Sequence, residues 1–200
     1  TIQSRCEIYT FKQPTRDVLA EVIAEVAKKE GYTLEKAAAE LVALLAEGSF
    51  RDALSILQKV LAVSRDKKVN VAEVEVVSGA PRGEIVRQLV VAIAKKDVDE
   101  ALVVIGEAVQ DNLDMRTLTR LLIHRMRVVL LLRFAPAIAE QFSKELTDVD
   151  LEQAKDISKN PGVTSETLRA LLDAYGQMAY ASVPHLPLEL ALIDLLGKRD

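Results

Sequence analysis

Apolar residues recur at helical spacing along nearly the whole chain, and this periodicity constrains the fold more than any other feature. In the first such stretch, Leu19, Val22, Ile23 and Val26 fall at i, i+3, i+4 and i+7. Side chains at this spacing line one face of an α-helix. Only the opening residues 2–8 alternate apolar and polar side chains instead. The sequence therefore predicts an all-α fold.

Capping signals divide the first part of the chain into three short helices. Thr15 is suited to cap a first helix that Gly31 ends, and Thr33 is expected to begin a second. Ser49 and Asp52 form a capping-box-like start for a third. This third helix is expected to bury one stripe at helical spacing, namely Phe50, Leu54, Leu57 and Leu61. Short helices with tight turns predict a small three-helix bundle.

A cluster of helix-breaking residues places a domain boundary near residue 79. Gly79 is expected to end a short helix, and Pro81 and Gly83 follow it closely. The sequence thus predicts a small domain over residues 1–79 and a larger helical domain over residues 80–200.

The larger domain is expected to form around one long helix. Residues 114–134 are apolar on most sides and are followed by Pro136, which predicts a central helix with neighbours all round. The other helices of this domain are expected around residues 85–93, from Asp97 to about 109, and over residues 149–160, 165–182 and 187–196.

Composition excludes several classes of protein. Unbroken apolar runs such as Leu89 to Ala94 are far shorter than the roughly 18 residues of a membrane span, so no membrane partner is expected. One cysteine, Cys6, and two histidines offer no internal disulfide and no metal-ligand spacing, which favours a reducing cytoplasm and no metal site. A net charge of −4 argues against a surface that grips nucleic acid as a whole.

Arg51 is the most informative candidate residue. With Ser49 as N-cap, it lies in the first turn of a helix, where the positive end of the dipole disfavours a cation. Either Asp52 compensates locally, or an anion such as a phosphate docks there.

Arg5, on the polar side of the opening segment, is either a solvated surface residue or an arginine that acts in trans on a phosphate.

The long helix carries a basic stripe. Arg116, Arg120, His124 and Arg127 fall at i, i+4, i+8 and i+11. A nucleic-acid contact is one interpretation. A solvated or subunit-facing stripe is favoured, because Arg125 and Arg133 leave this face and no aromatic residue accompanies it.

The sequence contains no self-sufficient active site. It has no GxxxxGK[ST] loop to bind phosphates, no GxSxG, no HExxH and no evident catalytic pair of carboxylates. The chain therefore lacks an ATP-binding loop of its own. Because the sequence starts with Thr1 and not with an initiator methionine, it is expected to begin inside a longer protein.

Two segments together resemble a known family. The residues TIQSRC at 1–6 and EGSFRDALS at 47–55 resemble the bacterial DNA polymerase III gamma/tau subunit, an AAA+ clamp-loader ATPase. In that family the first motif closes the ATPase domain, and the second starts the third helix of the lid. The resemblance continues with lower specificity through residues 68–71 and 188–192. It implies an AAA+ lid over 1–79, preceded by the end of the ATPase domain at about 1–12, and a helical collar, the oligomerisation domain, over 80–200.

The resemblance also implies roles for individual residues. Arg5 matches the arginine finger that reaches the nucleotide of the next subunit. Arg51 matches the sensor 2 arginine, with Ser49 beside it at the nucleotide site. The stripe of Arg116, Arg120 and Arg127 is then expected at a subunit interface.

By the same resemblance, the full-length protein uses ATP and Mg²⁺ to load the sliding clamp on primed DNA during replication by DNA polymerase III. Its collar would bind the other clamp-loader subunits. The chain itself is expected to be inactive alone and to hold neither ATP nor Mg²⁺.

Three alternatives remain open. One is a related clamp-loader subunit, either delta-prime or the archaeal small subunit, although the RDALS wording favours gamma/tau. Another is a helical adaptor with no nucleotide role, for which Arg51 is a surface residue. The third is a DNA-binding module, which the net charge disfavours. The choice between the gamma and tau products also stays open.

Overall fold

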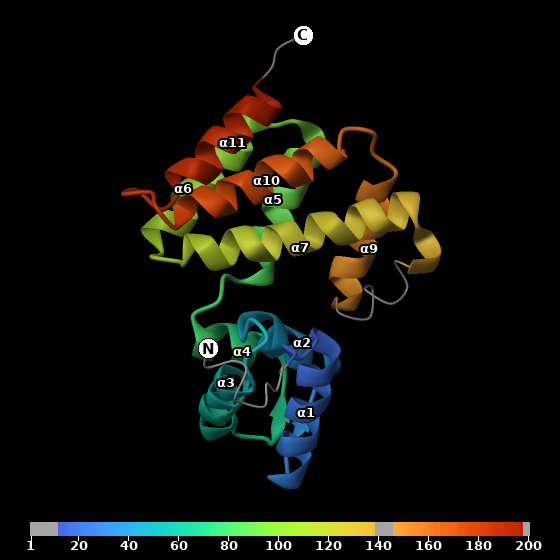
Figure 1. The fold of residues 1–200 in the computed structure, drawn as a ribbon, viewed down its shortest axis with the longest axis vertical. Helices are drawn as coiled ribbons and strands as arrows, with labels where there is room; N and C mark the ends of the chain where they lie inside the picture. Colours follow the sequence, from blue (N-terminus) through green and yellow to red (C-terminus); the bar gives the residue numbers. More distant parts are fainter. Residues whose placement is uncertain (1–11, 139–145, 198–200) are drawn as a thin grey trace, which may run out of the picture. The chain divides into compact units, whose positions relative to one another are not determined.

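The computed structural model describes residues 12–138 and 146–197, and its regular structure is almost entirely helical (Figure 1). The all-α prediction is confirmed. The chain forms two compact units that divide between Asn70 and Val71, here called unit 1 and unit 2.

Over its described residues, 12–70, unit 1 is a bundle of three helices with one short pair of strands. The helices are α1 (Arg16–Lys29), α2 (Lys36–Leu45) and α3 (Phe50–Val63), and the strands are β1 (Thr33–Leu34) and β2 (Lys68–Val69). Helix α1 packs against both α2 and α3. The core between them consists of small and branched apolar side chains, including Leu19, Ile23, Ala27, Ala38, Val42, Leu57 and Val60. The predicted three-helix bundle is confirmed.

The start of the second helix was predicted wrongly. Thr33 does not begin α2, because Thr33 and Leu34 pair in parallel with Lys68 and Val69. The N–H of Thr33 donates to the carbonyl of Lys67 at 2.8 Å. This pairing joins segments far apart in the sequence, so local capping signals could not reveal it.

The buried face of α3 also differs from the prediction. Leu57 is buried as expected, but Phe50 and Leu54 are 42% and 38% exposed. The buried residues are instead Ala53, Leu57 and Val60, together with part of Leu61. Both stripes share Leu57, and the small side chain of Ala53 lets α3 approach its neighbours closely.

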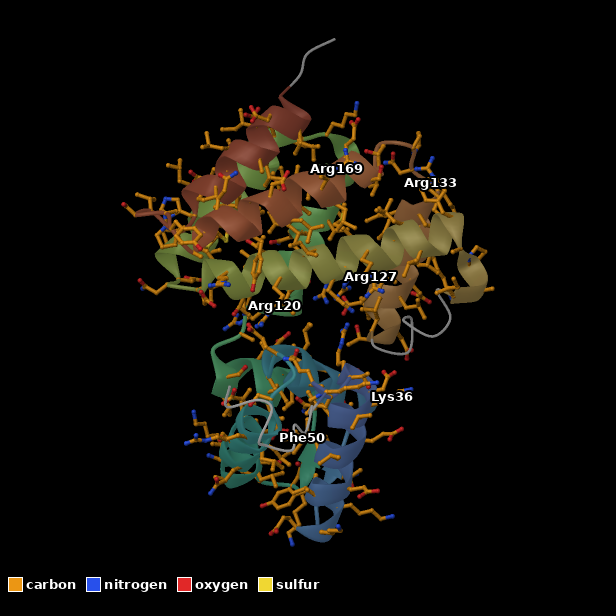
Figure 2. The ribbon with its side chains drawn as sticks, in the orientation of Figure 1. Lys36, Phe50, Arg120, Arg127, Arg133 and Arg169 are labelled. Atoms are coloured by element: carbon orange, nitrogen blue, oxygen red, sulfur yellow. The ribbon has the colours of Figure 1, made fainter. Side chains whose placement is uncertain are left out.

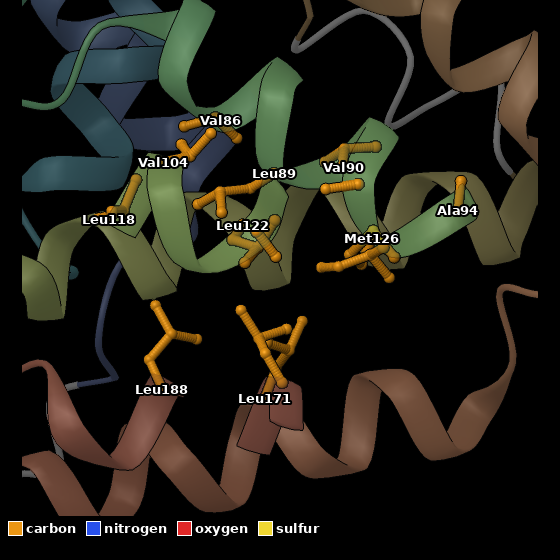
Figure 3. Close-up of a cluster of buried hydrophobic side chains, with 14 of the residues drawn as sticks. Val86, Leu89, Val90, Ala94, Val104, Leu118, Leu122, Met126, Leu171 and Leu188 are labelled. Carbon is orange, nitrogen blue, oxygen red and sulfur yellow. The ribbon is translucent and has the colours of Figure 1, made fainter. Parts of the chain in front are cut away.

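Unit 2 contains the remaining described helices. They are α4 (Val71–Ser78), α5 (Gly83–Lys95), α6 (Val98–Gln110), α7 (Met115–Phe134), α9 (Asp148–Ser158), α10 (Ser165–Met178) and α11 (Leu186–Leu196). Helix α7 is central, as predicted, and packs against α5, α9 and α10. Figure 3 shows its Leu118, Leu122 and Met126 facing side chains of α5, and Leu171 and Leu188 on the other side.

The two units divide ahead of the boundary expected near residue 79, so that α4 groups with unit 2. One contact that contributes to this grouping is made by Glu75 of α4, whose carboxylate accepts the backbone N–H of Gly83 at 2.8 Å. Because Gly83 is the first residue of α5, Glu75 caps this helix across the turn. Within the described residues, no helix has both the length and the apolar character needed to cross a membrane.

Candidate functional site

The N-terminus of α3 carries the two candidate residues of unit 1. Ser49 is the N-cap, and its hydroxyl accepts the backbone N–H of Asp52 at 3.2 Å, which confirms the predicted cap. Arg51 lies in the first turn and is exposed to solvent. A guanidinium thus stands beside the positive end of a helix dipole, an arrangement suited to binding an anion. Asp52, also exposed in this turn, supplies a local negative charge as well.

The loop that leads into α3 has a constrained backbone. Glu47 and Gly48 have φ angles of 51° and 83°, both in the left-handed region. The side-chain amide of Gln13 donates from Nε2 to the carbonyl of Glu47 at 2.7 Å. Gln13 could not be singled out from the sequence, because no local signal relates residues that lie 34 positions apart.

The other candidates near the start of the chain cannot be placed. Arg5 and Cys6 lie outside the described residues. Their roles therefore stay predictions.

The basic stripe lies on α7, as the spacing indicated. Arg116 and Arg127 are exposed and Arg120 is partly buried; Figure 2 labels Arg120 and Arg127 on this helix. All three also interact with other residues of the chain. The expectation that no aromatic residue accompanies the stripe was wrong, because the guanidinium of Arg116 lies over the ring of Tyr175, 4.9 Å from its centroid. Tyr175 belongs to α10, so this contact depends on tertiary packing.

Arg125 and Arg133 leave the stripe, as predicted. Arg133 lies near the end of α7 and donates to the carbonyls of Asn160 and Val163 at 3.1 and 3.0 Å. Arg125 is buried, and its guanidinium lies 2.7 Å from the carboxylate of Asp150. These two arginines therefore serve the packing of unit 2.

Asp150 is a buried acid that sequence analysis did not single out. Its Oδ1 also lies 3.0 Å from the guanidinium of Arg87. Burial alone would raise the pKa of Asp150, but hydrogen bonds and charge from Arg125, with further hydrogen bonds from Thr147 and Arg87, hold the pKa below its ordinary value of 3.8. The carboxylate is thus ionised and structural, and it joins α5, α7 and α9.

A search of the described residues finds no group of three or more His, Cys, Asp or Glu side chains placed to hold a metal ion. The arrangement that remains for chemistry in unit 1 is the exposed guanidinium of Arg51 at the capped start of α3. It can bind and orient an anion.

Comparison with known proteins identifies this region. Residues 19–66 match the family of the DNA polymerase III clamp loader subunit, ATPase lid domain, and this range includes Ser49 and Arg51. Over 199 residues, the chain is 25% identical to DNA polymerase III subunit tau of Bacillus subtilis, an alignment that covers 98% of this chain and 34% of that protein.

Two further proteins show related similarity. The replication factor C small subunit of Methanococcus maripaludis is 35% identical over 98 residues, which cover 49% of this chain and 31% of that one. The solved structure of the Bacillus subtilis DNA clamp loader delta protein matches with a TM-score of 0.48 and 18% identity, over 94% of this chain and 58% of that chain.

The chain spans about a third of the length of these curated relatives. The matched lid and the near full-length alignment with a tau subunit confirm the resemblance that the two sequence motifs indicated. Residues 19–66 therefore match the clamp-loader lid family, and the chain along nearly its whole length is similar to a tau subunit of bacterial DNA polymerase III.

Proposed function

We propose that this chain forms the lid and collar of the motor subunit of a bacterial DNA polymerase III clamp loader. In this function, ATP binding and hydrolysis drive the loading of the sliding clamp on primed DNA. The observation that carries the proposal is the exposed Arg51 in the first turn of a helix capped by Ser49, inside the matched lid region.

Arg51 acts as the sensor of the nucleotide in its own subunit. A guanidinium is permanently charged and can bond two phosphate oxygens at once, and the helix N-terminus adds to the attraction. Helix α3 buries Ala53, Leu57 and Val60 within unit 1. A contact between Arg51 and the γ-phosphate therefore moves the bundle as one body and changes the angle between domains.

Arg5 acts on the nucleotide of the neighbouring subunit. An arginine that meets the charge developing on the transferred phosphoryl group accelerates hydrolysis by orders of magnitude. The sequence has no phosphate-binding GxxxxGK[ST] loop. We assign that loop and the Mg²⁺ site to the remainder of the full-length protein, and we expect no tight ATP binding by this chain alone.

Unit 2 acts as the collar that holds the subunits in a ring. Its proposed partners are the other clamp-loader subunits, with Arg116, Arg120 and Arg127 of α7 at the interface. The assembled complex, in the bacterial cytoplasm, binds the sliding clamp and primed DNA. The presence of the lid and the alignment along the whole chain support this assignment.

The test is clamp-loader ATPase activity in a reconstituted complex, with and without clamp and primed DNA. In the full-length protein, Arg5→Ala and Arg51→Ala should each reduce the ATP hydrolysis stimulated by clamp and primed DNA about tenfold or more. The complex should still assemble with either variant. Arg65→Ala, which removes another exposed arginine of unit 1, is the control. Unchanged turnover in both test variants would leave only a helical scaffold and would refute the proposed mechanism.

A second candidate is a small subunit of the archaeal type. The 35% identity to the replication factor C small subunit over about half of this chain favours it. Both candidates use the same lid, so activity with Arg51 variants cannot separate them. Assembly with purified partners can, because a gamma/tau-type subunit should join the subunits of a bacterial clamp loader, and an archaeal-type subunit should join those of an archaeal clamp loader.

A further inference from the structure

Gln13 makes a long-range contact with the loop in front of Arg51. Its side-chain Nε2 donates to the carbonyl of Glu47 at 2.7 Å, across 34 positions of sequence. Its side chain also lies directly on Gly48, since a Cβ added to this glycine would come within 2.3 Å of Nε2 and within 2.7 Å of Cγ. The contact therefore depends on a hydrogen-bond donor at position 13 and on the absence of a side chain at position 48.

The loop that Gln13 contacts has a backbone in the left-handed region, which is unfavourable for a residue with a Cβ. Glu47 has a φ of 51°, a conformation that residues with a Cβ adopt at a cost, and Gly48 continues it at 83°. Gly48 leads directly into Ser49, whose hydroxyl fixes the first turn of α3. The path of residues 47–48 therefore sets where the first turn begins and the direction in which Arg51 projects.

We propose that Gln13 is a positioning residue for the nucleotide-sensing arginine. By holding the carbonyl of Glu47, it keeps the loop in the shape that presents Arg51 to a phosphate. In the sequence, Gln13 lies between Arg5 and α1, so the bond also connects the segment after the candidate finger to the loop before the candidate sensor. This inference rests on the function proposed for Arg51.

The chemistry of the contact suggests matched variants. Gln13→Glu keeps the size of the side chain but replaces the donor with oxygen, which repels the carbonyl of Glu47. Gln13→Lys keeps a donor at the end of a chain of sufficient length. Gln58→Glu makes the same change as the first variant at an exposed position of α3 and serves as the control.

The first experiment measures amide hydrogen exchange in this chain, with no nucleotide present. Gln13→Glu should speed the exchange of the Asp52 N–H, which the Ser49 cap protects, by about three- to tenfold and leave the amides of α1 unchanged. Gln13→Lys and Gln58→Glu should exchange like the wild type. Faster exchange throughout α1, or no change at Asp52, would overturn the positioning role.

The second experiment measures ATP hydrolysis in the reconstituted clamp loader with the full-length protein. Gln13→Glu should raise the KM for ATP about three- to tenfold and leave kcat within about twofold, because it loosens the loop before Arg51 but leaves the guanidinium in place. Gln13→Lys should restore the KM. A KM unchanged by Gln13→Glu, or raised equally by Gln13→Lys, would overturn the inference.

Arg51→Ala separates the role of Gln13 from the function of Arg51 itself. If Arg51→Ala impairs hydrolysis while Gln13→Glu does not, the function proposed for Arg51 stands and the role of Gln13 is refuted. If Arg51→Ala leaves hydrolysis unchanged, the proposed function itself fails, and amide exchange still decides whether Gln13 holds the loop.

Discussion

The guanidinium of Arg125 lies 2.7 Å from the carboxylate of Asp150, and both side chains are buried in unit 2. Arg125 comes from the central helix α7 and Asp150 from the first turn of α9. Arg87 of α5 reaches the same carboxylate oxygen at 3.0 Å. One acid therefore compensates two arginines on two other helices, and its removal would leave a buried positive charge without its counterpart.

Replacing Asp150 with alanine should destabilise the chain by about 3 kcal/mol or more, because a buried ion pair that loses one partner leaves an uncompensated charge. Urea unfolding gives the measurement. The control is Asp156→Ala, which removes a carboxylate 3.0 Å from Lys159 in a pair that is more than three-quarters exposed. That variant should lose no more than about 0.5 kcal/mol. Equal losses in both variants would contradict the structural role of Asp150.

The same carboxylate predicts a dependence of stability on pH. The pKa of Asp150 is lower in the folded chain than its ordinary value of 3.8, so the unfolded chain binds more protons in this range. The contribution of Asp150 is therefore present above the unfolded pKa and is lost as the pH falls through the folded pKa. The difference in unfolding free energy between wild type and Asp150→Asn should shrink steadily below about pH 5. A difference that stays constant down to about pH 3 would disprove this linkage.

Two glycine substitutions should have opposite effects on the stability of the folded chain. Gly48→Ala forces a side chain into the left-handed region and onto Gln13, and should cost about 1–3 kcal/mol. Gly106→Ala lies within α6 with open space around its Cβ, and should stabilise by about 0.5–1 kcal/mol. Thermal and urea unfolding of the two variants measure this. A destabilised Gly106→Ala would show that the surroundings of α6 are tighter than described.

Charge reversal on α7 tests the proposed interface. Arg120→Glu combined with Arg127→Glu should weaken assembly with the other clamp-loader subunits by about tenfold or more, because like charges replace attraction at a subunit contact. Analytical ultracentrifugation of the reconstituted complex measures assembly. The control is a double variant with the same change in charge at two exposed arginines outside α7, Arg82→Glu with Arg169→Glu. Assembly unchanged in the α7 variant would remove this stripe from the interface.

Features set by neighbouring residues could be predicted from the sequence. The predicted caps at Thr15 and Ser49 are confirmed, since each side chain accepts the backbone N–H three residues later. The central helix of residues 114–134 and the three-helix bundle were likewise predictable, because apolar periodicity records a helix face directly. The two motifs around Arg5 and Arg51 were enough to indicate the clamp-loader family.

Contacts between distant segments required the tertiary structure. The bond from Gln13 to Glu47, the strand pair of Thr33 and Lys68, and the packing of Arg116 on Tyr175 each join residues more than 30 positions apart. No propensity or spacing specifies such a partner, because it depends on which faces meet when the helices pack.

The sequence by itself determined where α1 and α3 begin, which family the chain resembles and that Arg51 stands at a helix start. Only the tertiary structure decided which face of α3 is buried and which arginines of α7 enter the core. The physical reason is that helix formation depends on interactions within a few residues, whereas burial depends on the shape and charge of neighbours that the chain brings together only on folding.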